Sequence, residues 1–204
     1  MIRTAILLLA LPLPALAVTL EMPNNAILSV QDVTAVGSYA MPTGPWSTDG
    51  LPVLIGEGEV VQQAWRIETP GLTTLQVLGP LQKQLDAAGF ETVFSCSSRA
   101  CGGFDFRFAT SVLPAPAMHV DLGDYQFFAA RRGEGVESEL ISLLASRSNT
   151  AGFVQVTRVG PASDAPVTEA QAPAIQAVSP TVTGGLVQEL EATCLLYTSD
   201  AADE

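Results

Sequence analysis

The chain has 204 residues, with 21 Asp and Glu against 9 Lys and Arg, a formal net charge of −12, three cysteines and one histidine. An acidic chain of this kind argues against nucleic acid and anionic lipid as partners, because both require clustered Lys and Arg. A single histidine also leaves little from which a catalytic or metal site could be built.

Residues 1–17 have the pattern of a secretory signal peptide. Arg3 is followed by an apolar run over residues 5–11, and Ala15, Leu16 and Ala17 form an A-x-A cleavage site. The apolar run is too short to cross a bilayer, so we expect no transmembrane helix after cleavage. Export would also place the cysteines in an oxidising compartment.

The domain that follows, residues 18–160, begins with short β-prone runs. Residues 27–30, 33–39 and 59–68 predict strands. Between them, residues 41–46 are rich in Pro and Gly and predict a loop. Trp46 would pack this loop onto the domain, and the alternative is an aromatic side chain that faces a ligand.

The clearest predicted helix covers residues 73–88, from Thr73 to Ala88. Thr73 and Gln76 fit a capping box, and Gly89 stands where a left-handed C-terminal cap belongs. Pro80 should kink or divide the helix. Five leucines at spacings of three and four form an apolar stripe that would cover the domain's own sheet: Leu72, Leu75, Leu78, Leu81 and Leu85.

Two cysteines precede an alternating aromatic segment. Four residues separate Cys96 from Cys101, which predicts a structural disulfide that stabilises the fold by about 2 kcal/mol. A redox dithiol, which more often has C-x-x-C spacing, and a metal site, which would need further ligands, are the alternatives. Phe104, Phe106 and Phe108 recur with period two, which predicts a half-buried strand over residues 104–108.

The rest of the domain reads mainly as sheet. Residues 91–95 predict a strand, and the prolines within residues 113–117 predict a connection. Residues 125–132, 139–148 and 152–159 predict three strands of an antiparallel meander, although residues 137–145 could also be helical. The expected fold class is therefore α+β, with an antiparallel sheet packed by one main helix and followed by a disordered linker.

One histidine and two acids are the strongest hint of chemistry. His119 and Asp121 would share a face if they lay on a strand, and a hydrolase-like site could add Asp124. With no second histidine to complete the site, we expect a surface histidine and assign no catalytic, cofactor-binding or metal-binding residue.

Arginines on the predicted strands have two interpretations. They could gather into a small basic cluster, or they could pair across strands with Glu137 and Glu139, which is the simpler account. The arginines are Arg131, Arg132, Arg147 and Arg158.

The C-terminal region divides into three segments. Residues 161–182 are rich in Pro and Ala and predict a linker, and residues 183–193 resemble the start of a second domain. Residues 194–204 resemble the in-frame translation of a transposon-type sequencing adapter, so we expect the natural protein to continue beyond Thr193. The alternative is an acidic tail that carries the third cysteine, Cys194.

Three segments carry a family resemblance: SYAMPTGPW at residues 38–46, CGGFDFRF at 101–108 and SRSNTAGFV at 146–154. Together they resemble the N-terminal region of certain OmpA-family envelope proteins of Gram-negative bacteria. In such proteins a signal peptide, an N-terminal α+β domain and a Pro/Ala linker precede a C-terminal domain that binds peptidoglycan. The signal peptide, the linker and the interrupted second helix of this sequence predict a non-catalytic periplasmic module, associated with the outer membrane or cell wall, and we expect no cofactor. Peptidoglycan would bind only through a missing C-terminal OmpA/MotB-like domain, whose binding motif no position here matches.

Overall fold

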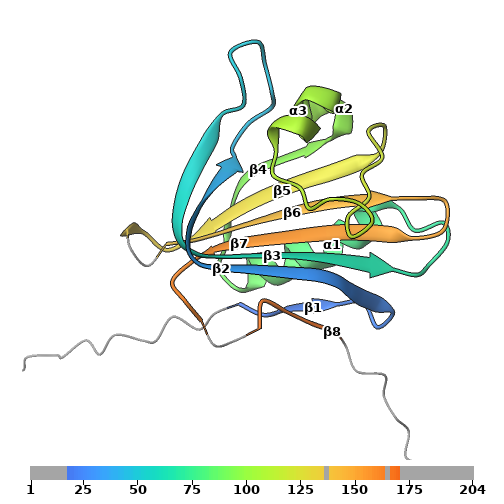
Figure 1. The fold of residues 1–204 in the computed structure, drawn as a ribbon, viewed down its shortest axis with the longest axis horizontal. Coiled ribbons are helices and arrows are strands. Elements are labelled where there is room, and N and C mark those ends of the chain that lie inside the picture. Colours follow the sequence, from blue (N-terminus) through green and yellow to red (C-terminus); the bar gives the residue numbers. More distant parts are fainter. Residues whose placement is uncertain (1–17, 136–137, 164–165, 171–204) are drawn as a thin grey trace, which may run out of the picture. The chain divides into compact units, whose positions relative to one another are not determined.

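A six-stranded antiparallel sheet is the centre of the fold in the computed structural model, which describes residues 18–135, 138–163 and 166–170. The strand order is β2-β3-β7-β6-β5-β4 (Figure 1). The strands are β2 (Ala26–Pro42), β3 (Val53–Ile67), β4 (Glu91–Ser97), β5 (Tyr125–Arg132), β6 (Glu139–Arg147) and β7 (Gly152–Gly160). The α+β class and the meander of β5, β6 and β7 are confirmed, and residues 139–147 are strand rather than helix.

Strand β2 is one long element where two short strands were predicted. Its pairing with β3 shifts register between Leu28 and Val30 and again between Thr34 and Gly37. Such bulges let a strand bend without ending. Gln31 and Asp32, which separate the two predicted runs, pair regularly with β3, so both runs belong to one 17-residue strand.

The far half of the β2–β3 hairpin leaves the sheet and rises above it (Figure 1). Strand β7 accompanies β3 only as far as the pair Glu59 and Gly160, beyond which β2 and β3 continue alone. Gly58 lies at the bend with φ of +137°, and a Cβ there would be 2.3 Å from the carbonyl oxygen of Gly160. Beyond the bend, the buried Tyr39 joins a hydrophobic core on the face of the sheet above which the hairpin rises.

Helix α1 (Thr74–Ala87) covers the opposite face. Its capping box is formed as predicted, and the N–H groups of Gly89 and Phe90 donate to the carbonyls of Asp86 and Leu85, which is a Schellman ending. The helix continues through Pro80 rather than dividing there. Leu75 is 63% exposed, because the buried stripe passes to one side of it. The stripe consists of Thr74, Val77, Leu78, Leu81 and Leu85.

Two short strands pair beside this helix. Strand β1 (Leu20–Met22) runs parallel to β8 (Thr168–Ala170). Val167 and Thr168 are buried, and the Thr168 hydroxyl donates to Oε1 of Gln63 at 2.5 Å. The linker was predicted to start at residue 161, but the domain extends at least to Ala170, where β8 ends. The predicted signal peptide and residues 171–204, with the expected second domain and adapter-like tail, lie outside the described residues.

The predicted strand at residues 104–108 is wrong. Helix α2 (Ser98–Cys101) and helix α3 (Gly103–Ala109) follow β4 instead. Gly102 and Gly103 have φ of +113° and +60°, and this left-handed turn starts a second helix directly after the first. Helices α2 and α3 lie on the face of the sheet opposite α1 (Figure 1).

A buried row of alternating charges crosses four strands on the α1 side. Glu139 accepts hydrogen bonds from Arg132 at 2.6 Å and from Arg158 at 2.5 Å, and Arg158 also reaches Glu59 at 3.3 Å. Arg158 is 2% exposed and Glu139 is 5% exposed. These contacts confirm cross-strand pairing with Glu139 rather than a basic cluster, while Glu137 lies outside the described residues.

Candidate functional site on the disulfide-tied helices

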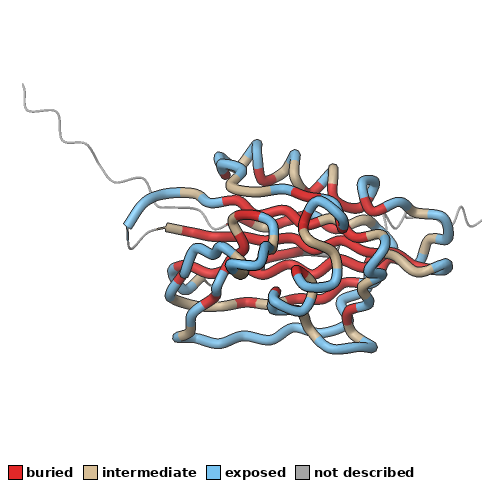
Figure 2. Tube along the Cα trace, turned by 90° about the horizontal axis from the view of Figure 1, so that it is seen from above, coloured by how far each residue is buried: buried red, intermediate tan, exposed pale blue. Residues whose placement is uncertain are grey.

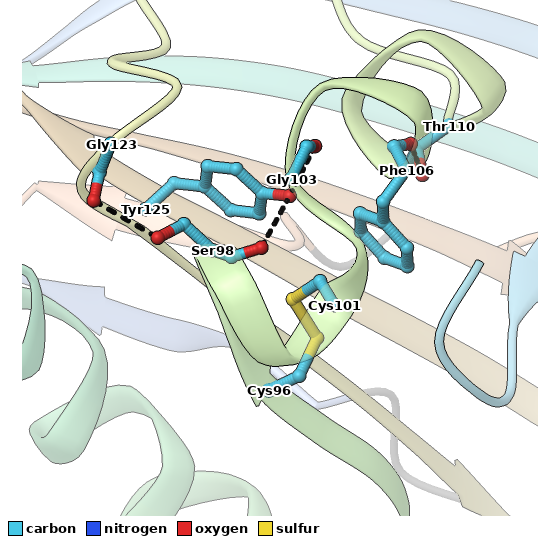
Figure 3. Close-up of a disulfide and its surroundings, with 8 residues drawn as sticks. All are labelled: Cys96, Ser98, Cys101, Gly103, Phe106, Thr110, Gly123 and Tyr125. Atoms are coloured by element: carbon cyan, nitrogen blue, oxygen red, sulfur yellow. Dashed lines mark hydrogen bonds between the residues drawn. A yellow bond between two sulfur atoms is a disulfide. The ribbon is translucent and has the colours of Figure 1, made fainter. Parts of the chain in front are cut away.

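The two short helices are joined to the sheet by a disulfide. Cys96 is the one buried residue of β4 and Cys101 is the last residue of α2, with their Cα atoms 5.2 Å apart and their sulfurs bonded (Figure 3). This pairing confirms the predicted disulfide. Since both sulfur atoms are used in the bond, neither acts as a thiol or a metal ligand in this state.

Tyr125 binds the turn between the two helices through its hydroxyl group. Its hydroxyl lies 2.8 Å from the carbonyl oxygen of Gly103 and 3.3 Å from that of Ser98, and the Ser98 hydroxyl donates to Gly123 (Figure 3). Burial raises the pKa of Tyr125 to about 12, against the opposing effect of the nearby Arg107 charge. The phenol therefore keeps its proton and remains a donor at neutral pH.

Helix α3 is oriented by one fully buried ring. Phe106 packs edge-on against Phe127, with ring centroids 5.1 Å apart, and stacks near Tyr125 at 6.3 Å. The Thr110 hydroxyl donates to the Phe106 carbonyl at 2.7 Å and ends the helix. The inward face of α3 is thus determined by a well-packed aromatic core.

The tip of the β2–β3 hairpin contacts the two short helices. The Trp46 N–H donates to the Cys101 carbonyl at 2.8 Å, and the Trp46 side chain packs against the core on this face of the sheet. A Cβ at Gly102 would meet the Trp46 Cβ at 3.0 Å. The prediction that Trp46 packs its loop onto the domain is confirmed.

The outward face of α3 carries two exposed phenylalanines. Phe104 and Phe108 are 59% and 64% exposed, and their ring centroids are only 4.4 Å apart. The Arg107 guanidinium lies 5.4 Å from the Phe108 centroid, and the exposed Arg99 lies on α2. We call Phe104, Arg107 and Phe108 the basic–aromatic patch, and Arg99 adds a second positive charge on the adjoining helix α2.

Arg99 and Arg107 have no carboxylate partner within 4 Å among the described residues. The arginines that do form ion pairs lie elsewhere: Arg66, Arg131, Arg132, Arg147 and Arg158. Burial lowers the pKa of Arg107 from its usual value. Asp105 also lies on α3, so the patch is a mildly basic surface on a strongly acidic protein.

His119, Asp121 and Asp124 follow α3 in a loop rather than on the strand that the H-x-D geometry assumed. His119 is exposed, and its ring lies 5.4 Å from that of Phe153. Asp121 accepts from the N–H of Gly123 within a tight turn, whereas the Asp124 carboxylate is bound by side chains of α1 and β6. In the part of the chain that the structure describes, no three His, Cys, Asp or Glu side chains are arranged to hold a metal ion.

Sequence reasoning missed the basic–aromatic patch. The available signal was the spacing of Phe104 and Phe108, four residues apart directly after two glycines, which also fits one face of a helix. The same three phenylalanines satisfy a period of two, so the pattern alone could not separate the two structures.

Neither a comparison with protein-family models nor a search of curated proteins finds a match for the chain. No helix among residues 18–135, 138–163 and 166–170 is long and apolar enough to cross a membrane.

Proposed function

We propose that residues 18–170 form a non-catalytic binding module of a periplasmic cell-envelope protein, and that the basic–aromatic patch is its contact surface. The observation that carries this proposal is the exposed pair Phe104 and Phe108 on a helix whose other side is fixed by packing and by a disulfide. Aromatic and Arg side chains dominate the energetics of protein interfaces.

A rigid support makes such a surface effective. Binding normally loses free energy to the ordering of loops and side chains, and a surface that is already held in place loses less. Here Phe106, Tyr125 and the disulfide fix the helix backbone. The exposed rings and arginines could therefore engage a partner that offers apolar groups next to carboxylates.

The envelope location rests on the signal-like N-terminus, the disulfide and the resemblance to OmpA-family proteins. A disulfide is typical of an oxidising compartment such as the periplasm. We further propose that attachment to peptidoglycan requires a domain encoded beyond Thr193. Sequencing the source gene across that position tests this part directly.

A hydrolase that uses His119 and nearby acids has less support. The Asp124 carboxylate accepts from Arg147 at 2.5 Å and from Thr74 at 3.1 Å, so it serves as a link between elements. A general base needs a carboxylate or imidazole that can reach a substrate proton. The Asp124 carboxylate is instead engaged by Arg147 and Thr74.

Site-specific photocrosslinking in the periplasm of a Gram-negative host tests the contact surface. A photoreactive residue would replace Phe104 in one variant and Leu75, which is 63% exposed on α1, in a matched control. We expect a discrete adduct from position 104 and none from position 75. Charge reversal by Arg99→Glu with Arg107→Glu should abolish the adduct while the thermal midpoint stays unchanged.

Equal labelling from both positions would count against the patch as a contact surface. So would an adduct at position 104 that survives charge reversal, because the arginines would then have no part in recognition.

A further inference from the structure

The free edge of the sheet at β2 has an unusual length and composition. Within the described residues only β3 pairs along β2, and residues 27–36 are all exposed (Figure 2). An edge strand has backbone N–H and C=O groups that no neighbouring strand satisfies. Apolar side chains accompany them: Ile27, Leu28, Val30, Val33 and Val36 are between 37% and 89% exposed.

This edge lacks most of the features that keep edge strands apart. Proteins usually place Lys or Pro on a free edge, or cover it with another element. Here β2 contains one charged residue, Asp32, and its one proline, Pro42, lies at the far end beyond the bend. The bulges at both ends of residues 30–34 leave the segment between them regular.

We propose that this edge pairs with the same edge of a second copy, so that two sheets join across a two-fold axis near Val33. In antiparallel pairing about such an axis, Val33 stands opposite the Val33 of the second copy. Asp32 of each copy then stands opposite Thr34 of the other, where the Thr hydroxyl can donate to the carboxylate.

Neighbouring registers are less favourable. A pairing centred on Asp32 would place two carboxylates directly opposite each other, which destabilises a strand pair. A pairing centred on Gln31 would place Asp32 opposite the apolar Val30. The register centred on Val33 gives every residue from 32 to 34 a suitable neighbour.

The surroundings of Val33 include apolar side chains that a second copy would cover. Val33 borders a hollow of about 270 Å³ whose lining combines the apolar Val61, Pro166 and Val167 with the polar Gln31, Glu59, Gln63 and Ser163. Because Val33 pairs with Val61 of β3, both side chains lie on the α1 face. A second Val33 would approach the rim of this hollow and cover apolar surface that is now open to water.

Two consequences distinguish this assembly from other kinds of association. A two-fold pairing uses the edge of both copies, so growth stops at the dimer. Each copy carries a formal charge of −12, so added salt should screen their repulsion and tighten the dimer. Binding through the basic–aromatic patch should instead weaken with salt.

Sedimentation equilibrium of the purified chain over a range of protein and salt concentrations tests the proposal. We expect a weak dimer, as befits a single-edge interface. Val33→Lys should weaken it about tenfold by removing the apolar pair and facing two cations, and Leu75→Lys on α1 should leave it unchanged. In a Cys194→Ser background, Val33→Cys should give an intermolecular disulfide and Leu75→Cys should not.

Several results would overturn the proposal. These are a monomer at every concentration up to about 1 mM, a dimer that Val33→Lys leaves intact, open-ended growth, or equal crosslinking at positions 33 and 75. A monomer that instead binds an added β-forming peptide along β2 would also overturn it, because the edge would then serve an extended partner.

Discussion

Removal of the Glu139 carboxylate should be among the most destabilising changes in the domain. Glu139 joins Arg132 and Arg158, and Arg158 is almost completely buried. Breaking one side of a buried ion pair costs about 3 to 5 kcal/mol, because a charge remains without compensation. Arg158 would keep Glu59 at 3.3 Å, so we expect Glu139→Ala to cost about 3 kcal/mol.

Urea unfolding followed by circular dichroism measures this change. A loss of about 3 kcal/mol corresponds to a fall of about 10 °C in the thermal midpoint for a domain of this size. The matched control is Glu91→Ala, which removes an exposed partner of Arg131 at 3.9 Å and should cost less than about 1 kcal/mol. Equal losses in the two variants would refute the reasoning.

A second variant separates the cost of an unpaired charge from the contribution of the pair itself. The double substitution Glu139→Leu with Arg158→Met replaces the two most buried charges of the row by apolar groups of similar length, while Arg132 keeps its hydrogen bond to the Ala88 carbonyl. Such replacements are often neutral or stabilising. We expect the double variant to be more stable than Glu139→Ala alone. If the double variant instead lost more unfolding free energy, the ion pairs themselves would stabilise the fold, beyond neutralising each other's charge.

Four further outcomes follow from the fold. Replacing both Cys96 and Cys101 by Ser should lower the unfolding free energy by about 2 kcal/mol, given their sequence separation of five, and an unchanged urea midpoint would contradict this. Gly58→Ala should cost at least about 2 kcal/mol because of its φ and the clash with β7. By contrast Gly79→Ala, with open space on α1, should stabilise by up to about 1 kcal/mol. Burial raises the pKa of Tyr39 to about 12, whereas an unfolded tyrosine titrates near 10. The unfolded chain therefore loses this proton first, and stability should fall between about pH 10 and 12, by about 3 kcal/mol for Tyr39. Tyr39→Phe should remove that part of the decline in urea titrations, and equal slopes for both proteins would argue against it.

Local signals predicted a large part of the fold. Helix α1 could be located because its capping residues, Thr73 and Gln76, and its terminal Gly89 act within a few residues of each other. The three strands of the meander could be located because turn-forming residues separate them, Gly133 and Gly135 before β6 and Ser148 and Asn149 before β7. In each case the pattern that forms the element is contained in the element itself.

Features that depend on distant contacts could not be predicted. Five residues with three phenylalanines fit both a strand and one and a half turns of helix, and the burial of Phe106 against β5 decided in favour of α3. The length of β2 depends on two bulges that only its pairing with β3 defines. Likewise, the charged row required the strand register that brings Arg132, Glu139 and Arg158 together. The basic–aromatic patch could not be identified until α3 was known to be a helix.

The parallel pairing of β1 and β8 determines how the domain would respond to mechanical force. Leu20 pairs with Thr168 and Met22 with Ala170, so the chain enters the pair at one end and leaves it at the other, about 10 Å away. Tension applied through the two flanking segments would therefore pull β1 and β8 past each other along their length. All the hydrogen bonds of the pair would be loaded at once, together with the bonds that join β1 to α1 and β8 to β3.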